Sequence, residues 1–227
     1  MAIIQPATLL FLSELKENNN REWFNTNKKD YLSSRDNLIE FADELLLRMR
    51  KHDHIETESG KKSLFRIYKD IRFSTDKSPY KAHMSGSFSR ATKLLRGGYY
   101  FHIQPGESFI GGGFWDPNPV DLKRIRQEIA ENPAELKEII SNKNFIKNFK
   151  SLEGEKVKTV PKGYNKDHPE IDLIRHKQYL LIKSFRDQDV LNSEFITEII
   201  ESFICMRQFF NYMSGILTTN SNGEALF

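Results

Sequence analysis

The stretch between residues 65 and 81 carries the side chains with the most evident chemistry. Its sequence is FRIYKDIRFSTDKSPYK. With the period of two that a strand imposes, every second residue from position 66 to 72 lies on one face. The residues of this polar face are Arg66, Tyr68, Asp70 and Arg72. Because arginine forks bind carboxylates and phosphates, and tyrosine adds a directional hydrogen bond, the face suits an anion.

Two further predicted strands extend this polar face. After a loop over residues 74–79, the chain alternates again, with Lys81 and His83 on the polar side. Residues 99–104 alternate in the same way and place Tyr100 and His102 together. We expect the polar faces of antiparallel neighbours to meet. The expected ligand-binding residues are Arg66, Tyr68, Asp70, Arg72, Lys77, Lys81, Tyr100 and His102.

Two histidines are the candidates for proton transfer. His83 and His102 are the groups in this stretch whose charge can change near neutral pH, so they are the candidate catalytic residues. Together with Asp70 they also have the composition of a two-histidine, one-carboxylate metal site. Nothing in the sequence enforces that geometry, so we expect no metal site. The sequence identifies no cofactor.

A structural interpretation competes with the ligand site. Asp70 could bridge neighbouring arginines in an internal ion-pair network beneath a covering helix. We expect an intermediate case, with Asp70 buried against Arg66 and with Arg72 left partly free for a ligand. The loop over residues 74–79 is expected to satisfy its own polar groups locally.

The overall charge argues against a large polyanionic partner. The 227 residues include 34 Lys and Arg against 31 Asp and Glu, a formal net charge of +3. This excess is too small to indicate nucleic-acid or membrane binding, and nucleic acid stays the minor alternative. A single cysteine, Cys205, excludes an intramolecular disulfide. The N-terminus lacks the pattern of a signal peptide and no apolar run could span a bilayer, so we expect a cytoplasmic protein.

The elements that would position these residues indicate an α+β fold. Strands are predicted at residues 65–73, 80–85, 99–104, 107–115 and 178–185. Helices are predicted at about residues 8–17, 29–51 and 193–217, and after the Asn-Pro pairs at 118–119 and 132–133. We expect one domain over residues 1–227. It would be an antiparallel meander packed with helices from the N-terminal, middle and C-terminal segments, with a frayed tail at 218–227.

The predicted C-terminal helix has apolar residues on more than one side. Phe195, Ile199 and Phe203 recur at helical spacing, and Ile196 and Ile200 flank them. Such a helix is either buried or lies at a homodimer interface. It is the surface that an interaction or scaffold protein would use.

Several motifs together resemble a widespread bacterial and fungal family, domain-of-unknown-function family 2461. The motifs are Asn18-Asn19 with Glu22-Trp23-Phe24, the long run from Arg66 to Ser74, Asp76 to Lys81, Tyr99-Tyr100, Gly112-Gly113, Pro117, and Pro161 to Tyr164 with Asp167-His168-Pro169. The resemblance implies a compact intracellular domain. It carries over no catalytic residue, because the family name records no assigned activity.

The leading hypothesis from the sequence is a binding module or enzyme for a small anionic ligand, bearing phosphate or carboxylate, at the polar sheet face. The alternatives are an interaction protein with a purely structural charge network, and nucleic-acid binding.

Overall fold

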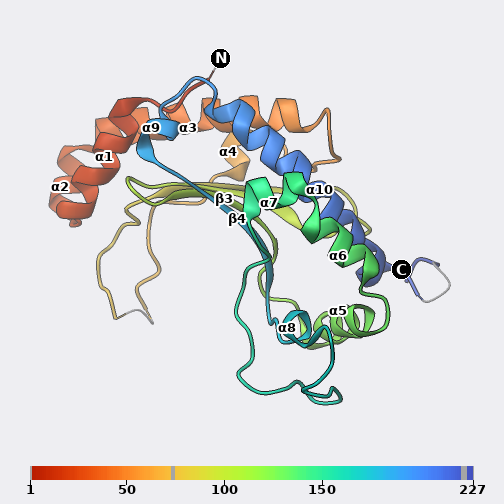
Figure 1. Ribbon diagram of the computed structural model, residues 1–227. Helices are drawn as coiled ribbons and strands as arrows, with labels where there is room; N and C mark the ends of the chain where they lie inside the picture. The colour runs from red at the N-terminus through yellow and green to blue at the C-terminus, as the bar shows by residue number, and fades with distance from the viewer. Residues whose placement is uncertain (1, 73–74, 221–223, 227) are drawn as a thin grey trace. The chain divides into compact units, whose positions relative to one another are not determined.

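The computed structural model describes residues 2–72, 75–220 and 224–226. Four strands form an antiparallel meander in the order β1-β2-β3-β4, and with the helices they make an α+β fold, as predicted (Figure 1). The strands are β1 (Met84–Ser89), β2 (Gly98–Ile103), β3 (Ser108–Phe114) and β4 (Tyr179–Phe185). The strands expected at 99–104, 107–115 and 178–185 are confirmed.

The chain comprises two compact units, each built from separate segments. The first unit contains Met1–Ser89, Tyr100–Ile110 and Ser184–Glu201, and the second contains Arg90–Tyr99, Gly111–Lys183 and Ser202–Phe227. The helices of the first unit are α1 (Pro6–Glu17), α2 (Arg21–Thr26), α3 (Lys28–Met49), α4 (Gly60–Ser63) and α9 (Asp187–Val190). Those of the second are α5 (Pro119–Glu131), α6 (Ala134–Ser141), α7 (Lys143–Phe149) and α8 (Ile171–Ile174). Helix α10 (Phe195–Thr218) contributes residues to both.

Helix α3 supplies much of the core of the first unit. Its apolar side chains recur at helical spacing, and Leu38, Phe41 and Leu45 are fully buried. The Phe41 ring packs 6.5 Å from that of Phe101 on β2 and 5.7 Å from that of Phe195, measured between centroids. Figure 1 shows α1 beside α3, and the two helices are in contact. The apolar face of the sheet is thereby covered by helix, which leaves its other face for polar residues.

Residues 64–72 and 75–83 form an arm instead of the regular strand pair that the sequence predicts. Among the described residues this segment makes isolated antiparallel bridges, between Leu64 and Gly86 and between Tyr68 and Tyr80. Strand β1 begins only at Met84. The expected strand at 65–73 is therefore wrong, and its residues 73 and 74 lie outside the described part of the chain.

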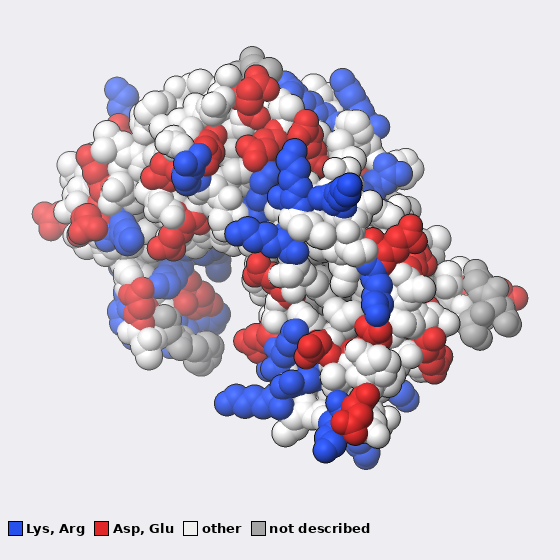
Figure 2. Space-filling view, viewed as in Figure 1, with Lys and Arg blue, Asp and Glu red and all other residues white. Residues whose placement is uncertain are grey.

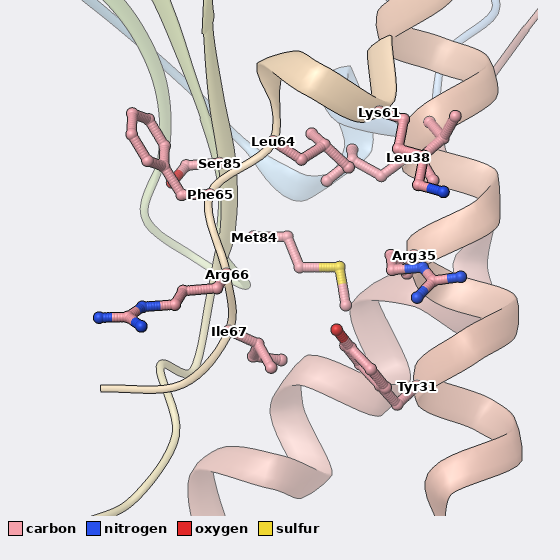
Figure 3. A pocket seen from close by; sticks show the side chains of 11 residues that line it. Tyr31, Arg35, Leu38, Lys61, Leu64, Phe65, Arg66, Ile67, Met84 and Ser85 are labelled. Atoms are coloured by element: carbon pink, nitrogen blue, oxygen red, sulfur yellow. The ribbon is translucent and has the colours of Figure 1, made fainter. Parts of the chain in front are cut away.

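The predicted alternation fails at the start of the arm. Phe65 was expected to face the core with Ile67, but Phe65 is 51% exposed while Ile67 is buried. Phe65 and Arg66 both point away from Met84 (Figure 3), so two consecutive side chains leave the backbone on one side. Side chains alternate between two faces only where a strand is hydrogen-bonded continuously to its neighbour. The arm is held by separate bridges, so its side chains need not alternate.

A side-chain clamp anchors the base of the arm to the N-terminal helices. The Asn19 amide group donates to the Tyr80 carbonyl oxygen over 2.9 Å and accepts from the Tyr80 N–H over 3.1 Å. The Phe24 ring stacks on the Tyr80 ring, with 3.9 Å between centroids. Asn20 caps α2, because its side chain accepts from the Trp23 N–H, and this fixes the turn that presents Phe24.

The second unit has a core of its own around Tyr99. The Tyr99 ring is fully buried and packs 4.9 Å from Phe203 and 5.3 Å from Phe210. Gly113, at φ +134°, lies so close to the Tyr179 carbonyl oxygen that a Cβ atom would stand 2.2 Å from it. Only a residue without a side chain fits this close backbone packing.

Both helices predicted after the Asn-Pro pairs are present, but only the first asparagine caps its helix. The Asn118 side chain caps α5 by accepting from the N–H groups of Val120 and Asp121. Asn132 is instead the C-cap of α5, and α6 starts at Ala134 with Pro133 at its N-cap position. The two helices follow each other too closely for Asn132 to serve the second one.

Helix α10 is buried on more than one side. Ile199, Phe203 and Met206 are fully buried, and Ile196 on the flanking side is 1% exposed. Burial within the chain accounts for the wide apolar surface, and association through this helix stays a prediction. The tail expected to be frayed begins inside α10, which ends at Thr218, and Thr219 then pairs with Ala225 in an isolated bridge. No helix in the described ranges combines the length and the hydropathy that a bilayer crossing requires.

Candidate functional site

The polar face of β2 carries a series of hydrogen-bonded side chains in the first unit. The Tyr100 hydroxyl lies 3.0 Å from Nδ1 of His102, and Nε2 of His102 lies 2.9 Å from Oε1 of Gln104. The Gln104 amide nitrogen donates to Oε2 of Glu107 over 2.7 Å. At its other end the Tyr100 hydroxyl forms a hydrogen bond with the Ser85 side chain of β1. We call Tyr100, His102, Gln104 and Glu107 the relay.

The relay assigns the tautomer of His102. The Glu107 carboxylate only accepts, so it takes the amide NH₂ of Gln104 and turns the amide oxygen toward His102. That oxygen requires a proton on Nε2 of His102. Nδ1 is then the acceptor for the Tyr100 hydroxyl proton. A neutral imidazole with a basic nitrogen aimed at a phenol is an arrangement suited to proton transfer.

His83 lies directly against the relay. Its ring centroid is 4.1 Å from that of His102, with 34° between the ring planes. His102 also stacks on Phe109, with 4.7 Å between centroids. Among the described residues, the ring nitrogens of His83 make no hydrogen bond. A half-buried imidazole with both nitrogens uncommitted is available to a ligand.

Burial keeps these rings neutral at pH 7. Burial, the neighbouring His102 ring, and the charges of Lys81 and Lys69 lower the pKa of His83 from the ordinary 6.5 to about 4. Burial also lowers the pKa of His102, against the opposing effect of its hydrogen bond to Gln104. Burial raises the pKa of Tyr100, so the phenol keeps its proton.

Two basic side chains border the relay. Nζ of Lys81 lies 5.9 Å from the centroid of the Phe65 ring, within range of a cation–π interaction. The Phe65 ring is in turn 6.3 Å from that of Tyr100. Arg66 follows Phe65 and points to the same side in Figure 3. Neither Lys81 nor Arg66 forms an ion pair with any residue that the structure describes.

The remaining predicted site residues lie on the arm. Asp70 forms an ion pair with Arg72, with 2.7 Å between Nη2 and Oδ2, and both side chains are exposed. The Arg72 hydrogen bonds hold the pKa of Asp70 below its usual range. The expectation that Asp70 is buried against Arg66 is therefore wrong, because Asp70 is exposed and its ion pair is with Arg72. Tyr68 packs against Phe24 and Tyr80.

The tip of the arm satisfies its own polar groups, as expected for the loop. Asp76 pairs with Lys69 and accepts hydrogen bonds from Ser78, and these interactions lower the pKa of Asp76. Nζ of Lys77 donates to the Ile71 carbonyl oxygen over 3.1 Å. The predicted residues thus fall into two groups. Lys81, Tyr100 and His102 join His83 on the sheet face, whereas Tyr68, Asp70, Arg72 and Lys77 belong to the arm.

Sequence reasoning missed two members of the relay. Gln104 lies two residues after His102 and therefore on the same strand face as Tyr100 and His102. Extending the predicted alternation by one step would have included it. Glu107 comes after the Pro105-Gly106 turn, where no periodicity predicts the direction of a side chain. Phe109 and Phe65, which carry no polar group that would indicate a site, also pack against the relay.

The family was identified by comparison with family models. The model described as Conserved hypothetical protein (DUF2461) matches residues 7–212. The chain belongs to this family. No curated protein and no solved structure matches it.

The structure shows what several DUF2461 motif residues do in this chain. Asn19, Phe24 and Tyr80 form the clamp at the base of the arm. Lys69 and Asp76, which come from the two halves of the long motif, pair with each other at its tip. Much of the DUF2461 motif therefore shapes and anchors the arm.

A metal centre is not what these residues form. In the described part of the chain, no three His, Cys, Asp or Glu side chains are grouped so that they could hold a metal ion. Asp70 pairs with Arg72 on the arm, and the histidines contact each other as rings.

Proposed function

We propose that the sheet face formed by Lys81, His83, Tyr100 and His102 binds a small anionic ligand that bears a phosphate or a carboxylate. The observation that carries the proposal is the coincidence of an ammonium group without an acidic partner and an uncommitted imidazole at one place. Lys81 has no ion pair among the described residues, and the His83 nitrogens have no hydrogen bond there. Partly buried donors of this kind form charge-assisted hydrogen bonds with an oxyanion.

Each residue has a distinct role in this proposal. Lys81 supplies the positive charge, and Phe65 holds its ammonium group by a cation–π contact. His83 supplies a ring N–H, and Arg66 is the second cation at the margin. An anion bound beside His83 favours the protonated imidazole, so ligand binding raises the pKa of His83 from about 4.

The relay gives the same face a way to move a proton. Tyr100 holds its proton against the basic Nδ1 of His102. Gln104 and Glu107 fix the ring so that this nitrogen stays aimed at the phenol. If the ligand is a substrate, Tyr100 and His102 are the acid–base pair, and His83 is the donor that orients it.

The distribution of charge favours a small ligand over a polymer. On the face shown in Figure 2, basic and acidic side chains lie next to one another, with no continuous surface of one sign. A nucleic acid needs a basic track along several phosphates. An isolated lysine with one arginine fits a single anionic group.

A thermal-shift screen of phosphorylated and carboxylated metabolites tests the proposal. A ligand that binds only the folded protein raises its melting temperature. The screen is run on the wild type, on Lys81→Gln, and on Lys62→Gln, which removes one exposed charge elsewhere in the first unit. We expect at least one compound to stabilise the wild type and Lys62→Gln by the same amount, and Lys81→Gln by less. Stabilisation equal in all three variants would contradict the proposal.

A further inference from the structure

A pocket lies in the first unit between α3 and residues 64–67, and Phe65, Arg66 and Ser85 are among the residues at its edge. It is enclosed by α3, α4, this segment and the start of β1, and it has a volume of about 210 Å³. Figure 3 shows the Tyr31 hydroxyl extending from α3 toward Met84, with Arg35 one turn further along α3 and Leu64 and Ile67 on the opposite wall. None of these residues belongs to the relay.

Both apolar and basic residues line the pocket. The apolar residues that line it are Leu38, Ile39, Leu64, Phe65, Ile67 and Met84. Its polar lining residues are Tyr31, Arg35, Lys61, Arg66 and Ser85. No Asp or Glu is among the described residues that line it. The pocket therefore has the character of a site for an anion with an apolar body.

The charges around the pocket show which cation is available. Arg35 forms an ion pair with Asp36, with 3.0 Å between Nη2 and Oδ1, and both side chains are exposed. It also forms a hydrogen bond with Tyr31, which orients the phenol. Lys61 forms no ion pair within the described ranges, and it lies on the surface of α4. Arg66 also lines the pocket without an ion pair among the described residues, but its side chain points away from Met84 in Figure 3, so Lys61 is the cation placed to meet a carboxylate at the mouth.

The size of the pocket limits the ligand to a single ring or a short chain. An engineered cavity of about 150 Å³ lined by aliphatic and aromatic side chains takes up benzene. A volume of about 210 Å³ leaves room for a ring of that size together with one carboxylate. The flexible thioether of Met84 can adapt to the shape of the apolar part.

We infer that this pocket binds a monocarboxylate with an aromatic or short aliphatic body. The apolar body lies against Leu38, Ile67 and Met84, and the carboxylate meets the Tyr31 hydroxyl and the Lys61 ammonium group. The site goes beyond the anion site of the sheet face. It selects for an apolar body, whereas the sheet face selects for the anionic group alone.

Titration with benzoate tests the inference, with benzamide as the uncharged analogue and acetate as the anion without a body. At about 0.5 kcal/mol for each of its nine heavy atoms, benzoate should bind with a Kd of roughly 0.5 mM. Benzamide should bind more weakly, and acetate should not saturate. Binding is followed by the chemical shifts of the Met84 methyl group, which report on the pocket whatever happens at the sheet face.

Two variants separate the apolar and the ionic parts of the site. Leu64→Phe fills the pocket and should weaken benzoate and benzamide about tenfold or more. Lys61→Gln should weaken benzoate about threefold and leave benzamide unchanged, while Lys62→Gln on the same helix should change neither. The melting temperature of each variant verifies folding. Benzoate that does not shift the Met84 signal, or that binds Leu64→Phe as well as it binds the wild type, would overturn the inference.

Discussion

The Tyr100 hydroxyl stands 3.0 Å from Nδ1 of His102, and the opposite nitrogen of the same ring is held 2.9 Å from Gln104. These two bonds predict that His102 carries its proton on Nε2. Long-range ¹H–¹⁵N correlation spectra of the ring nitrogens measure this tautomer directly. In Glu107→Ala the Gln104 amide loses the partner that fixes its orientation, so we expect the His102 signals to shift toward a tautomer mixture. A pure Nδ1–H form in the wild type would refute the relay.

His83 should make stability depend on pH in a defined window. Its pKa is about 4 in the folded protein, against an ordinary value of 6.5. The unfolded chain therefore binds more protons between these values, so stability is complete above about pH 6.5 and falls as the pH drops toward 4. With allowance for the partial exposure of the ring, we expect on the order of 2 kcal/mol from this residue.

The His83 effect is measured as a difference between variants. Urea unfolding of the wild type and of His83→Gln at pH 7 and pH 5 isolates it from other titrating groups. His54→Gln is the control, because His54 is exposed and lies outside the relay. We expect His83→Gln to lose less stability than the wild type between the two pH values. An identical loss in both would show that His83 does not titrate as proposed.

Asn18 and Asn19, which are neighbours in the sequence before α2, should differ sharply in their contribution to the free energy of unfolding. Asn19 bonds both backbone groups of Tyr80, whereas the Asn18 side chain donates to the Glu14 carbonyl oxygen within its own helix end. Asn19→Ala should therefore lower the free energy of unfolding by about 1–3 kcal/mol. Asn18→Ala should cost much less. Equal costs in chemical denaturation would mean that the clamp does not hold the arm.

Two ion pairs offer a contrast between exposed and half-buried charge. Asp70 and Arg72 are both exposed, so Asp70→Asn should leave the melting temperature unchanged. Asp121 is 9% exposed, pairs with Arg96 over 2.7 Å and also accepts from Asn118. Asp121→Asn should cost about 2 kcal/mol, because it leaves a partly buried guanidinium unpaired. A large loss of stability in Asp70→Asn would contradict the exposed ion pair and would support a buried ion-pair network instead.

Local signals in the sequence account for most of the fold. Helix α3, strand β2 and the Asn118 cap follow from spacing and capping chemistry, which act over a few residues. The arm could not be predicted as such, because its conformation depends on Asn19, which is 61 residues before Tyr80. From the local sequence alone, Phe65 to Phe73 has the alternation of apolar and polar residues that is typical of an ordinary strand.

The residues of the candidate site could also be predicted where they follow a local pattern. Tyr100 and His102 follow from the alternation along β2, and Lys81 follows from its charge. Their connection through Gln104 to Glu107 could not be predicted, because it crosses a turn. Nor could the pairing of Asp70 with Arg72, because alternation gives the face of a residue but not whether another layer covers it.

The most direct test of anion binding is to observe His83 while a ligand is added. Side-chain ¹H–¹³C spectra of the six histidines are recorded during titration with phenyl phosphate and with any compound found in the thermal-shift screen. We expect the His83 and His102 signals to move together along a saturating curve while His54 stays in place. We also expect Lys81→Gln to weaken binding about threefold or more. Titrations with the phosphate and with the screened compounds in which His83 does not move, or moves no more than His54, would contradict the proposed site.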